Sequence, residues 1–365
     1  MYTPILALSL ITAVFALPRH LPAACREIGI PITVSVPRFI INVTVDNNWD
    51  AVSLTLNLTR RDFSYPTDPL PISSTSPPVE STYTIGATLC GSGGSILVLT
   101  HGIIESKLYW QPTFEGSETY SFVDAAVAAG YSILSYDRIG VGSSSKVNAL
   151  SDAQFQVETA VLDSLVDYAR NTVNASKVAL IGHSYGSYLS AASASQTDVD
   201  ALVLTGFSGN FSYFGPFLAG SGFRVANIKD PVRWGALDAG YVTASDLYAE
   251  TYVYYAEPYF EHRVAEWSYN FGSEPFAVGE LPSLLDTTIE YENITAPVLL
   301  LQGQFDLSAC GGNCVGLLED TKGKFSKAKV IEAVDNLAAG HNLNLHKIAP
   351  QAFEMIFNFL KAQGI

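Results

Sequence analysis

Residues 178–190 read VALIGHSYGSYLS, and this stretch predicts the fold. Residues 178–181 are apolar and predict a short buried strand, while residues 185–195 are mostly small and compatible with a helix. Ser184 therefore stands at a sharp turn from strand to helix, where residues two positions away have no room for side chains. Glycine at 182 and 186 meets that requirement, so the stretch has the G-x-S-x-G pattern of a nucleophile elbow. The turn presents the serine hydroxyl beside the positive end of a helix.

Strand-like and helix-like segments alternate on both sides of this turn. Apolar, strand-like segments also occur at 95–102, 131–140, 201–207, 296–306 and 327–334. Helix-like segments occur at 119–130, 152–170 and 347–361. This alternation predicts an α/β fold with a mostly parallel sheet that is covered by helices on both faces.

Two regions depart from the alternation. Before residue 93 the chain is rich in Thr, Ser, Pro and β-branched residues, which predicts antiparallel strands at 32–36, 52–58 and 83–89 and an irregular surface loop at 65–79. Residues 208–291 are rich in Tyr, Phe and Trp and have helical character. We expect this second region to form a cap over the serine, in which most aromatic side chains pack and a few line a pocket.

A serine hydroxyl needs a base, and the base needs a third group that orients it. In a fold with this elbow the acid and the histidine follow the serine in that order along the chain. Asp306 ends the strand-like segment 296–306, and His341 follows the segment 327–334 directly after a glycine. We therefore predict Ser184 as nucleophile, His341 as base and Asp306 as acid, with Asp335 and His346 as the alternatives.

The oxyanion formed by attack on a carbonyl needs backbone N–H donors. The residue after the nucleophile, Tyr185, supplies one, and the loop HGIIES after the strand-like segment at 95 supplies the other. Within that loop Ile103 is the expected donor, with Ile104 as the alternative. His101 in this loop is expected to be structural, and Asp137 and Arg138 to form a structural ion pair.

These motifs resemble the α/β-hydrolase superfamily, and most of all its serine esterase and lipase branch. The resemblance lies in HG at 101–102, DRIGVG at 137–142, GHSYG at 182–186, the strand end at Asp306 and GH at 340–341. It implies an eight-stranded, mostly parallel sheet with helices on both faces, a cap inserted after strand 6 and a triad of Ser184, His341 and Asp306. Serine at the elbow, where epoxide hydrolases and dehalogenases carry aspartate, argues against those two reactions.

The chain divides accordingly into five parts. They are a signal peptide at 1–16, an N-terminal extension with the first antiparallel strands at 17–92, two halves of the hydrolase core at 93–207 and 292–365, and the cap at 208–291. The signal peptide is indicated by an apolar run at 4–17 that is too short to cross a bilayer and by small residues at Val14 and Ala16, before the expected cleavage site. No other stretch is long and apolar enough to span a membrane.

Composition agrees with a secreted globular protein. The 365 residues are 48% hydrophobic and 15% charged, and the net charge of −15 opposes binding to nucleic acid or an anionic membrane surface. Glycosylation sequons begin at Asn42, Asn57, Asn174, Asn210 and Asn293. Four cysteines allow three pairings, of which local closure favours Cys310–Cys314 and leaves Cys25–Cys90. The absence of a C-x-x-C pair and of a nearby histidine cluster argues against zinc.

The sequence thus predicts a secreted serine hydrolase that cleaves carboxylic esters, with lactones as a related class of small-molecule substrate. No metal or organic cofactor is expected, because nucleophile, base and oxyanion donors are all protein groups. Two alternatives use the same triad: an acyltransferase, and a peptidase in which Glu261 or Glu266 holds an amino terminus. A third is a binding protein with this fold, although such proteins usually lack a triad member. The sequence predicts no oligomeric state.

Overall fold

The computed structural model describes residues 25–59 and 71–365, so the signal peptide predicted at 1–16 lies outside the described residues. The centre of the fold is an eight-stranded sheet with the order β1-β2-β4-β3-β5-β6-β10-β11. Its strands are β1 (Cys25–Ile41), β2 (Ile72–Cys90), β3 (Ser95–Thr100), β4 (Ser132–Tyr136), β5 (Lys177–His183), β6 (Ala201–Thr205), β10 (Val298–Gly303) and β11 (Ile331–Leu337). The strands from β4 to β11 pair in parallel, whereas β2 pairs antiparallel with both β1 and β4. The predicted eight-stranded, mostly parallel sheet is confirmed.

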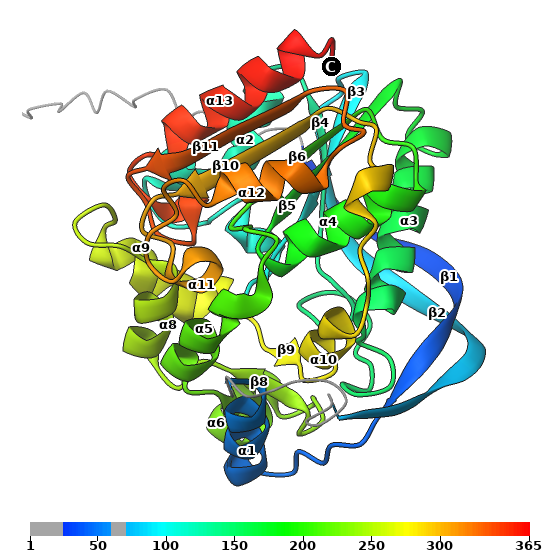
Figure 1. Ribbon diagram of the computed structural model, residues 1–365, viewed down its shortest axis with the longest axis vertical. Helices are drawn as coiled ribbons and strands as arrows, with labels where there is room; N and C mark the ends of the chain where they lie inside the picture. The colour runs from blue at the N-terminus through cyan, green and yellow to red at the C-terminus, as the bar shows by residue number, and fades with distance from the viewer. Residues whose placement is uncertain (1–24, 60–70) are drawn as a thin grey trace, which may run out of the picture.

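Helices cover both faces of this sheet, as predicted (Figure 1). On one face, α2 (Phe122–Ala128) packs against α13 (Ala349–Ala362) through the rings of Phe122, Phe353 and Phe357. The other face carries α3 (Phe155–Asn171), α4 (Tyr185–Gln196) and α12 (Leu318–Lys324). The central strands are buried on both sides, which is why they read as continuous apolar runs rather than as alternating ones.

The chain between β6 and β10 forms an insertion at one end of the sheet, in the lower part of Figure 1. Its helices are α5 (Phe214–Ser221), α6 (Ala226–Lys229), α7 (Pro231–Trp234), α8 (Leu247–Tyr254), α9 (His262–Trp267) and α10 (Glu280–Leu285). It also contains a three-stranded sheet of β7 (Arg224–Val225), β8 (Tyr241–Thr243) and β9 (Phe276–Ala277). The helical character predicted for this region is present, but the small sheet was not foreseen because its strands are only two or three residues long.

Strands β1 and β2 continue beyond the main sheet as a long two-stranded arm that reaches toward the insertion (Figure 1). The irregular loop predicted for 65–79 is therefore wrong for residues 72–79, which pair with β1; residues 65–70 lie outside the described part of the chain. Pro77 and Pro78 suggested a loop. They are tolerated in this arm because a proline fits where a strand has a neighbour on one side only.

The segment predicted as a strand at 52–58 is a helix, α1 (Asn48–Thr59). The pattern VSLTLNL alternates like a strand, but the side chain of Asn47 accepts a hydrogen bond from Trp49 N at 2.8 Å and so favours the start of a helix. On that helix Ala51 and Leu54 are three residues apart and share the face that is buried against the insertion. Tertiary burial thus outweighs the local alternation.

Two disulfides form, Cys25–Cys90 and Cys310–Cys314, which are the pairings favoured from the sequence. The first joins the start of β1 to the end of β2, within the main sheet, where Cys90 also pairs with Ile133 of β4. The second closes a loop between α11 (Leu307–Cys310) and α12. A cross-link reduces the conformational entropy of the unfolded chain, so both loops are held close to their folded geometry.

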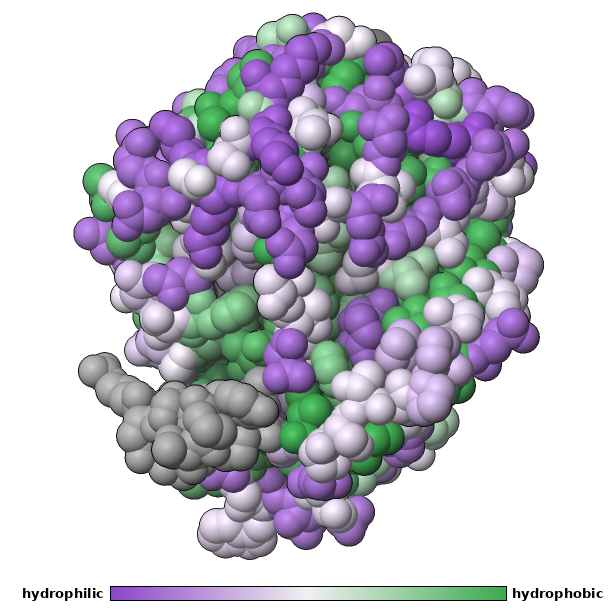
Figure 2. Space-filling view, turned by 45° about the vertical axis from the view of Figure 1, so that its right-hand side comes forward, coloured by the Kyte–Doolittle hydropathy of each residue, from purple (hydrophilic) through white to green (hydrophobic). Residues whose placement is uncertain are grey.

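Most large exposed apolar side chains belong to α1 and to the insertion, among them Trp49, Leu56, Val232, Tyr248 and Phe271. Hydrophilic residues predominate over the upper half of the face in Figure 2, and hydrophobic residues are more frequent in its lower half. Within residues 25–59 and 71–365 no helix is long and apolar enough to cross a membrane.

We expect α1 to contribute to stability through its buried face. Leu54 is 9% exposed and packs with Leu218 and Phe223 of the insertion, so Leu54→Ala removes buried methyl groups and should lower the free energy of unfolding by about 2 kcal/mol. Leu56, two residues along the same helix, is 61% exposed. Leu56→Ala should therefore change the free energy of unfolding by less than about 0.5 kcal/mol. Urea denaturation of both variants measures the difference, and equal losses would contradict the assigned packing.

Candidate active site

Ser184 stands between the end of β5 and the first residue of α4, in a backbone conformation that is rare for any residue except glycine, φ 55° and ψ −123°. A Cβ at position 182 would lie 2.4 Å from Gly186 O, and one at 186 would lie 2.2 Å from Thr100 O. Both distances are shorter than van der Waals contact, so only glycine fits at either position. The sharp turn predicted from the sequence is therefore present, with the serine half-buried at its apex.

Asp306 and His341 lie next to each other although 35 residues separate them. Asp306 follows β10 and caps α11, where one of its carboxylate oxygens accepts a hydrogen bond from Ala309 N at 2.7 Å. Its other oxygen, Oδ2, lies 2.7 Å from His341 Nδ1 and also accepts from the Gln302 side chain. A carboxylate beside Nδ1 places the imidazole proton on that nitrogen, which leaves Nε2 as the acceptor.

His341 and Ser184 line the same small cavity. His341 Nε2 is buried and has no hydrogen-bond partner among the described residues. Gly206, after β6, lies close to the ring of His341: a Cβ there would stand 2.9 Å from His341 Cε1. The geometry thus brings a hydroxyl, an imidazole acceptor and a buried carboxylate into one place.

The alternative acid and base are engaged elsewhere. Asp335 is half-buried and accepts a hydrogen bond from Gly316 N at 2.7 Å. His346 is fully buried, with Nδ1 bound to Asn342 O and with Nε2 accepting from Ala256 N and Gly340 N. Both ring nitrogens of His346 are therefore occupied, and neither residue lines the cavity around Ser184.

The loop after β3 passes directly beside the serine. A Cβ on Gly102 would lie 2.8 Å from Ser184 Cβ, so this position too requires glycine. Ile103 and Tyr185, the two residues expected to donate their N–H groups, both line the cavity, whereas Ile104 does not. The carbonyl of Ile103 accepts a hydrogen bond from the hydroxyl of Tyr254, which ties this loop to α8 of the insertion.

The cavity itself is small, about 20 Å³, and mostly apolar. Its walls come from the core, through Tyr188, and from the insertion, through Phe214, Phe217 and Leu281. A space of this size holds about one water molecule. Phe214 and Phe217 are thus the aromatic residues of the insertion that line the pocket, and most of the others pack among themselves.

Glu105 is a buried acid of this site that the sequence reasoning missed. Its Oε2 accepts a hydrogen bond from Gly102 N at 2.6 Å, and its Oε1 lies 3.4 Å from His183 Nε2. Thr205 Oγ1 donates to Gly182 O and so accepts from His183 Nδ1, which leaves His183 Nε2 as an acceptor. Burial raises the pKa of Glu105 well above its usual range. Neither Glu105 Oε1 nor His183 Nε2 makes a hydrogen bond with any described residue.

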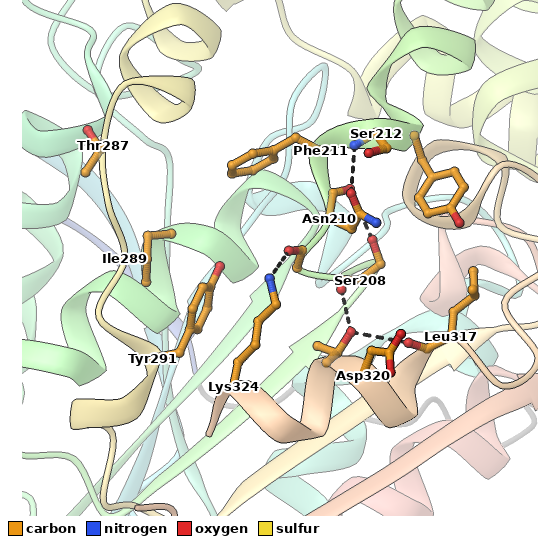
Figure 3. A pocket seen from close by; sticks show the side chains of 13 residues that line it. Ser208, Asn210, Phe211, Ser212, Thr287, Ile289, Tyr291, Leu317, Asp320 and Lys324 are labelled. Atoms are coloured by element: carbon orange, nitrogen blue, oxygen red, sulfur yellow. Dashed lines mark hydrogen bonds between the residues drawn. The ribbon is translucent and has the colours of Figure 1, made fainter. Parts of the chain in front are cut away.

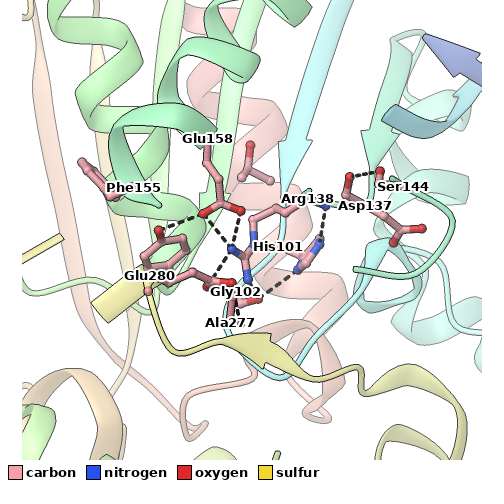
Figure 4. Close-up of polar contacts among 12 residues, drawn as sticks. His101, Gly102, Asp137, Arg138, Ser144, Phe155, Glu158, Ala277 and Glu280 are labelled. Carbon is pink, nitrogen blue, oxygen red and sulfur yellow. Dashed lines mark hydrogen bonds and ion pairs between the residues drawn. The ribbon is translucent and has the colours of Figure 1, made fainter. Parts of the chain in front are cut away.

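A second buried cluster links Gly102 of the loop after β3, and Tyr185 after the nucleophile, to the insertion (Figure 4). Arg138 Nη1 lies 2.8 Å from carboxylate oxygens of both Glu158 on α3 and Glu280 on α10. The hydroxyl of Tyr185 donates to Glu158 at 2.8 Å, and the guanidinium carbon of Arg138 lies 4.6 Å from the centroid of the Tyr185 ring. Arg138 Nη2 also donates to Gly102 O at 3.3 Å.

The predicted ion pair of Asp137 with Arg138 is therefore wrong. Asp137 instead accepts hydrogen bonds from Lys107 N at 2.9 Å and from Ser143 N at 2.8 Å, and Arg138 turns away from it to the two glutamates. His101 has the structural role that was expected, since its Nε2 accepts from Arg138 N at 3.1 Å. Glu158 was detectable in principle as a charge on the apolar face of α3, but nothing in the sequence indicates Glu280.

The buried cluster predicts a pH dependence of stability. Burial raises the pKa of Glu158 from 4.5 to about 8, and Arg138 opposes this rise. Between those values the folded protein holds a proton that the unfolded chain has lost, so the free energy of unfolding should fall as pH rises. Urea denaturation from pH 5 to 8.5 measures this slope. Glu158→Gln should make it shallower, and Glu319→Gln on exposed α12 should leave it unchanged; equal slopes in all three proteins would refute the assignment.

A family model described as the alpha/beta hydrolase family matches residues 97–352. The chain belongs to this family. The eight-stranded sheet with its inserted region is the alpha/beta hydrolase fold, as expected from the motifs. The search of curated protein sequences gave no match.

Solved structures of similar fold include three with low sequence identity. A bromoperoxidase from Bacillus anthracis is 19% identical with a TM-score of 0.55, covering 77% of this chain and 96% of that one. A monoacylglycerol lipase from Paleococcus ferrophilus is 18% identical with a TM-score of 0.54, covering 76% and 99%. A thermophilic esterase from Thermogutta terrifontis is 14% identical with a TM-score of 0.54, covering 77% and 95%. At these identities the likeness concerns the fold alone.

Within the described residues no group of three or more His, Cys, Asp or Glu side chains is placed to hold a metal ion. The groups gathered around Ser184 are a hydroxyl, an imidazole, a carboxylate and two backbone N–H positions. Such a set can carry out nucleophilic attack, proton transfer and stabilisation of an oxyanion with protein groups.

Proposed function

We propose that this hydrolase cleaves carboxylic esters through an acyl-enzyme on Ser184. The observation that carries the proposal is the buried contact of 2.7 Å between Asp306 Oδ2 and His341 Nδ1, with His341 Nε2 and Ser184 on the same cavity. A serine at such an elbow is a weak nucleophile without a base, and a histidine held by a carboxylate supplies one.

In the proposed reaction Ser184 Oγ attacks the ester carbonyl while His341 Nε2 accepts the hydroxyl proton. The N–H groups of Ile103 and Tyr185 donate to the oxyanion of the tetrahedral intermediate. The C–O bond to the alcohol then breaks, and the alcohol leaves with the proton from His341. Water, deprotonated by the same histidine, attacks the acyl-enzyme and releases the acid, which returns Ser184 to its starting form.

The insertion is proposed as the specificity element of this reaction, because Phe214, Phe217 and Leu281 bound the cavity without contributing an ionisable group. Their apolar surfaces favour an uncharged acyl chain close to the serine. Some neighbours in fold are named as an esterase and a monoacylglycerol lipase, which agrees with the proposed ester chemistry.

The peptidase alternative finds less support. It requires an acid near Ser184 to hold a free amino terminus, and the two candidates from the insertion lie elsewhere. Glu261 binds the side chains of Tyr120 and Arg263, and Glu266 is exposed on a different groove. Neither residue lines the cavity of Ser184.

We further propose that the protein is secreted and glycosylated. Two disulfides favour an oxidising compartment. All five sequon asparagines, at 42, 57, 174, 210 and 293, are exposed and thus accessible to glycosylation. The apolar run at 4–17 supplies the expected leader.

The proposed chemistry predicts that a fluorophosphonate probe labels the protein once, at Ser184. Ser184→Ala should abolish labelling, and Ser184→Ala or His341→Ala should lower turnover of a nitrophenyl ester about 10⁴–10⁶-fold, because triad members act as a unit. Asp306→Asn should cost about 10⁴-fold through the wrong imidazole tautomer, whereas Asp335→Asn serves as the matched control and should retain activity. Full activity in a folded Ser184→Ala protein would overturn the proposal. Faster cleavage of aminoacyl anilides than of esters would favour a peptidase.

The proposed secretion predicts a mature chain that begins near Leu17, carries glycans on sequon asparagines and has no alkylatable thiol before reduction. Each outcome follows from export into an oxidising, glycosylating compartment. Mass spectrometry of protein from the native source, with and without reduction, measures all three. Detection of Met1, or of four thiols that react without reduction, would contradict the proposal.

A further inference from the structure

A cleft of about 680 Å³ opens on the surface beside the small cavity of Ser184. Three segments form its walls: residues 208–213 at the start of the insertion, residues 287–291 near its end, and helix α12 (Figure 3). The side chains along it combine aromatic rings with hydrogen-bonding groups. They include Asn210, Tyr213, Tyr291, Asp320, Thr321 and Lys324.

Packed aromatic side chains separate this cleft from the nucleophile. Tyr188 and Phe214 line the inner cavity, and Phe211 lines the cleft. The ring of Phe211 lies 5.2 Å from that of Tyr188 and 5.3 Å from that of Phe214, measured between centroids. The two spaces therefore share a wall of contacting rings, and half-buried Phe211 belongs to that wall.

The polar groups of the cleft divide into those that hold the loop 208–213 and those that face the open space. Lys324 Nζ donates to Gly209 O at 2.6 Å and Thr321 Oγ1 donates to Ser208 O at 2.6 Å, so both fix the loop against α12. Asp320 is exposed, and its carboxylate makes no hydrogen bond or ion pair with any described residue. In Figure 3 it lies on α12, across the cleft from Ile289 and Tyr291.

This arrangement fits a neutral, hydroxylated ligand. A carboxylate accepts hydrogen bonds from hydroxyl groups, and Tyr213 and Tyr291 contribute aromatic surface to the cleft, against which the C–H groups of a sugar ring can pack. An anionic ligand fits poorly, because Asp320 carries a negative charge in the cleft without a cationic partner among the described residues, and the chain carries a net charge of −15.

We propose that the cleft binds the alcohol part of the ester and that this part is a neutral polyhydroxylated ring the size of a mono- or disaccharide. The proposal rests on the ester hydrolysis proposed above and names its substrate class. In this proposal a change of rotamer at Phe211 joins the cleft to the small cavity and enlarges the space at Ser184, so that the acyl group lies against the apolar walls there. The sugar alcohol, protonated by His341 as the C–O bond breaks, departs through the cleft.

The test compares three butyrate esters that differ only in the alcohol: methyl 6-O-butyryl-glucoside, ethyl butyrate and 4-nitrophenyl butyrate. The wild-type protein should hydrolyse the sugar ester with a kcat/KM about 10-fold above that of the ethyl ester. Asp320→Asn should lower kcat/KM for the sugar ester about 10-fold, mainly through KM, and change the nitrophenyl ester less than about twofold. Glu319→Gln, the neighbouring carboxylate outside the cleft, is the matched control and should change neither.

Equal kcat/KM for the sugar and ethyl esters, or an equal loss on all three esters in Asp320→Asn, would overturn the assignment of the cleft and leave the ester chemistry intact. Absence of nitrophenyl ester turnover and of fluorophosphonate labelling would instead overturn the proposed function and the cleft assignment with it. Kinetics are measured on protein freed of N-linked glycans, because Asn210 begins a sequon at the edge of the cleft.

Discussion

The close approach of three backbone segments at the elbow is the constraint on which the site depends. Ser184 N donates to Thr205 O at 2.9 Å, so the turn after β5 is joined to the end of β6, while Gly186 lies against the end of β3. No side chain fits between these segments. The three strand ends that meet here carry the serine, the loop with Gly102 and Ile103, and the turn at Gly206 against His341. The strained conformation of Ser184 persists because the close contacts of the neighbouring backbone segments leave the turn no alternative conformation.

A layer of buried charge lies behind this turn and links it to the insertion. Arg138, from the loop after β4, contacts Glu158 on the core helix α3 and Glu280 on the insertion helix α10, and all three side chains are almost fully buried. One guanidinium between two carboxylates cannot neutralise both, and burial raises the pKa of both Glu158 and Glu280. The same arginine contacts Gly102 and Tyr185. Arg138 thus connects α10 to Tyr185, one of the two residues proposed to bind the oxyanion.

The N-terminal arm has a role that its sequence did not suggest. It carries α1 from the edge of the sheet to the insertion. There Asn48 accepts a hydrogen bond from Val225 N at 2.9 Å, and Leu54 packs against apolar side chains of the insertion. The insertion is therefore held from two sides, by α1 outside and by Glu280 at the core. Between these supports it presents apolar rings to the serine and a polar cleft to solvent. This contrast is the physical basis for the proposed separation of an acyl side from an alcohol side.

The sequence by itself determined the alternating core, the elbow at Ser184 and the order of Asp306 and His341 along the chain, and it favoured the disulfide pairings that the structure shows. These features follow from local patterns: apolar runs, glycines at fixed offsets and cysteine spacing. Tertiary structure alone decided that 52–58 is helical, because burial of Ala51 and Leu54 outweighs an alternating pattern, and that Arg138 pairs with Glu158 and Glu280 rather than with Asp137. The sequence likewise did not indicate the roles of Glu105 and Glu280, or the small cavity at Ser184 with the cleft beside it. Their chemistry arises from burial and from contacts between distant segments, and no local pattern of residues encodes either.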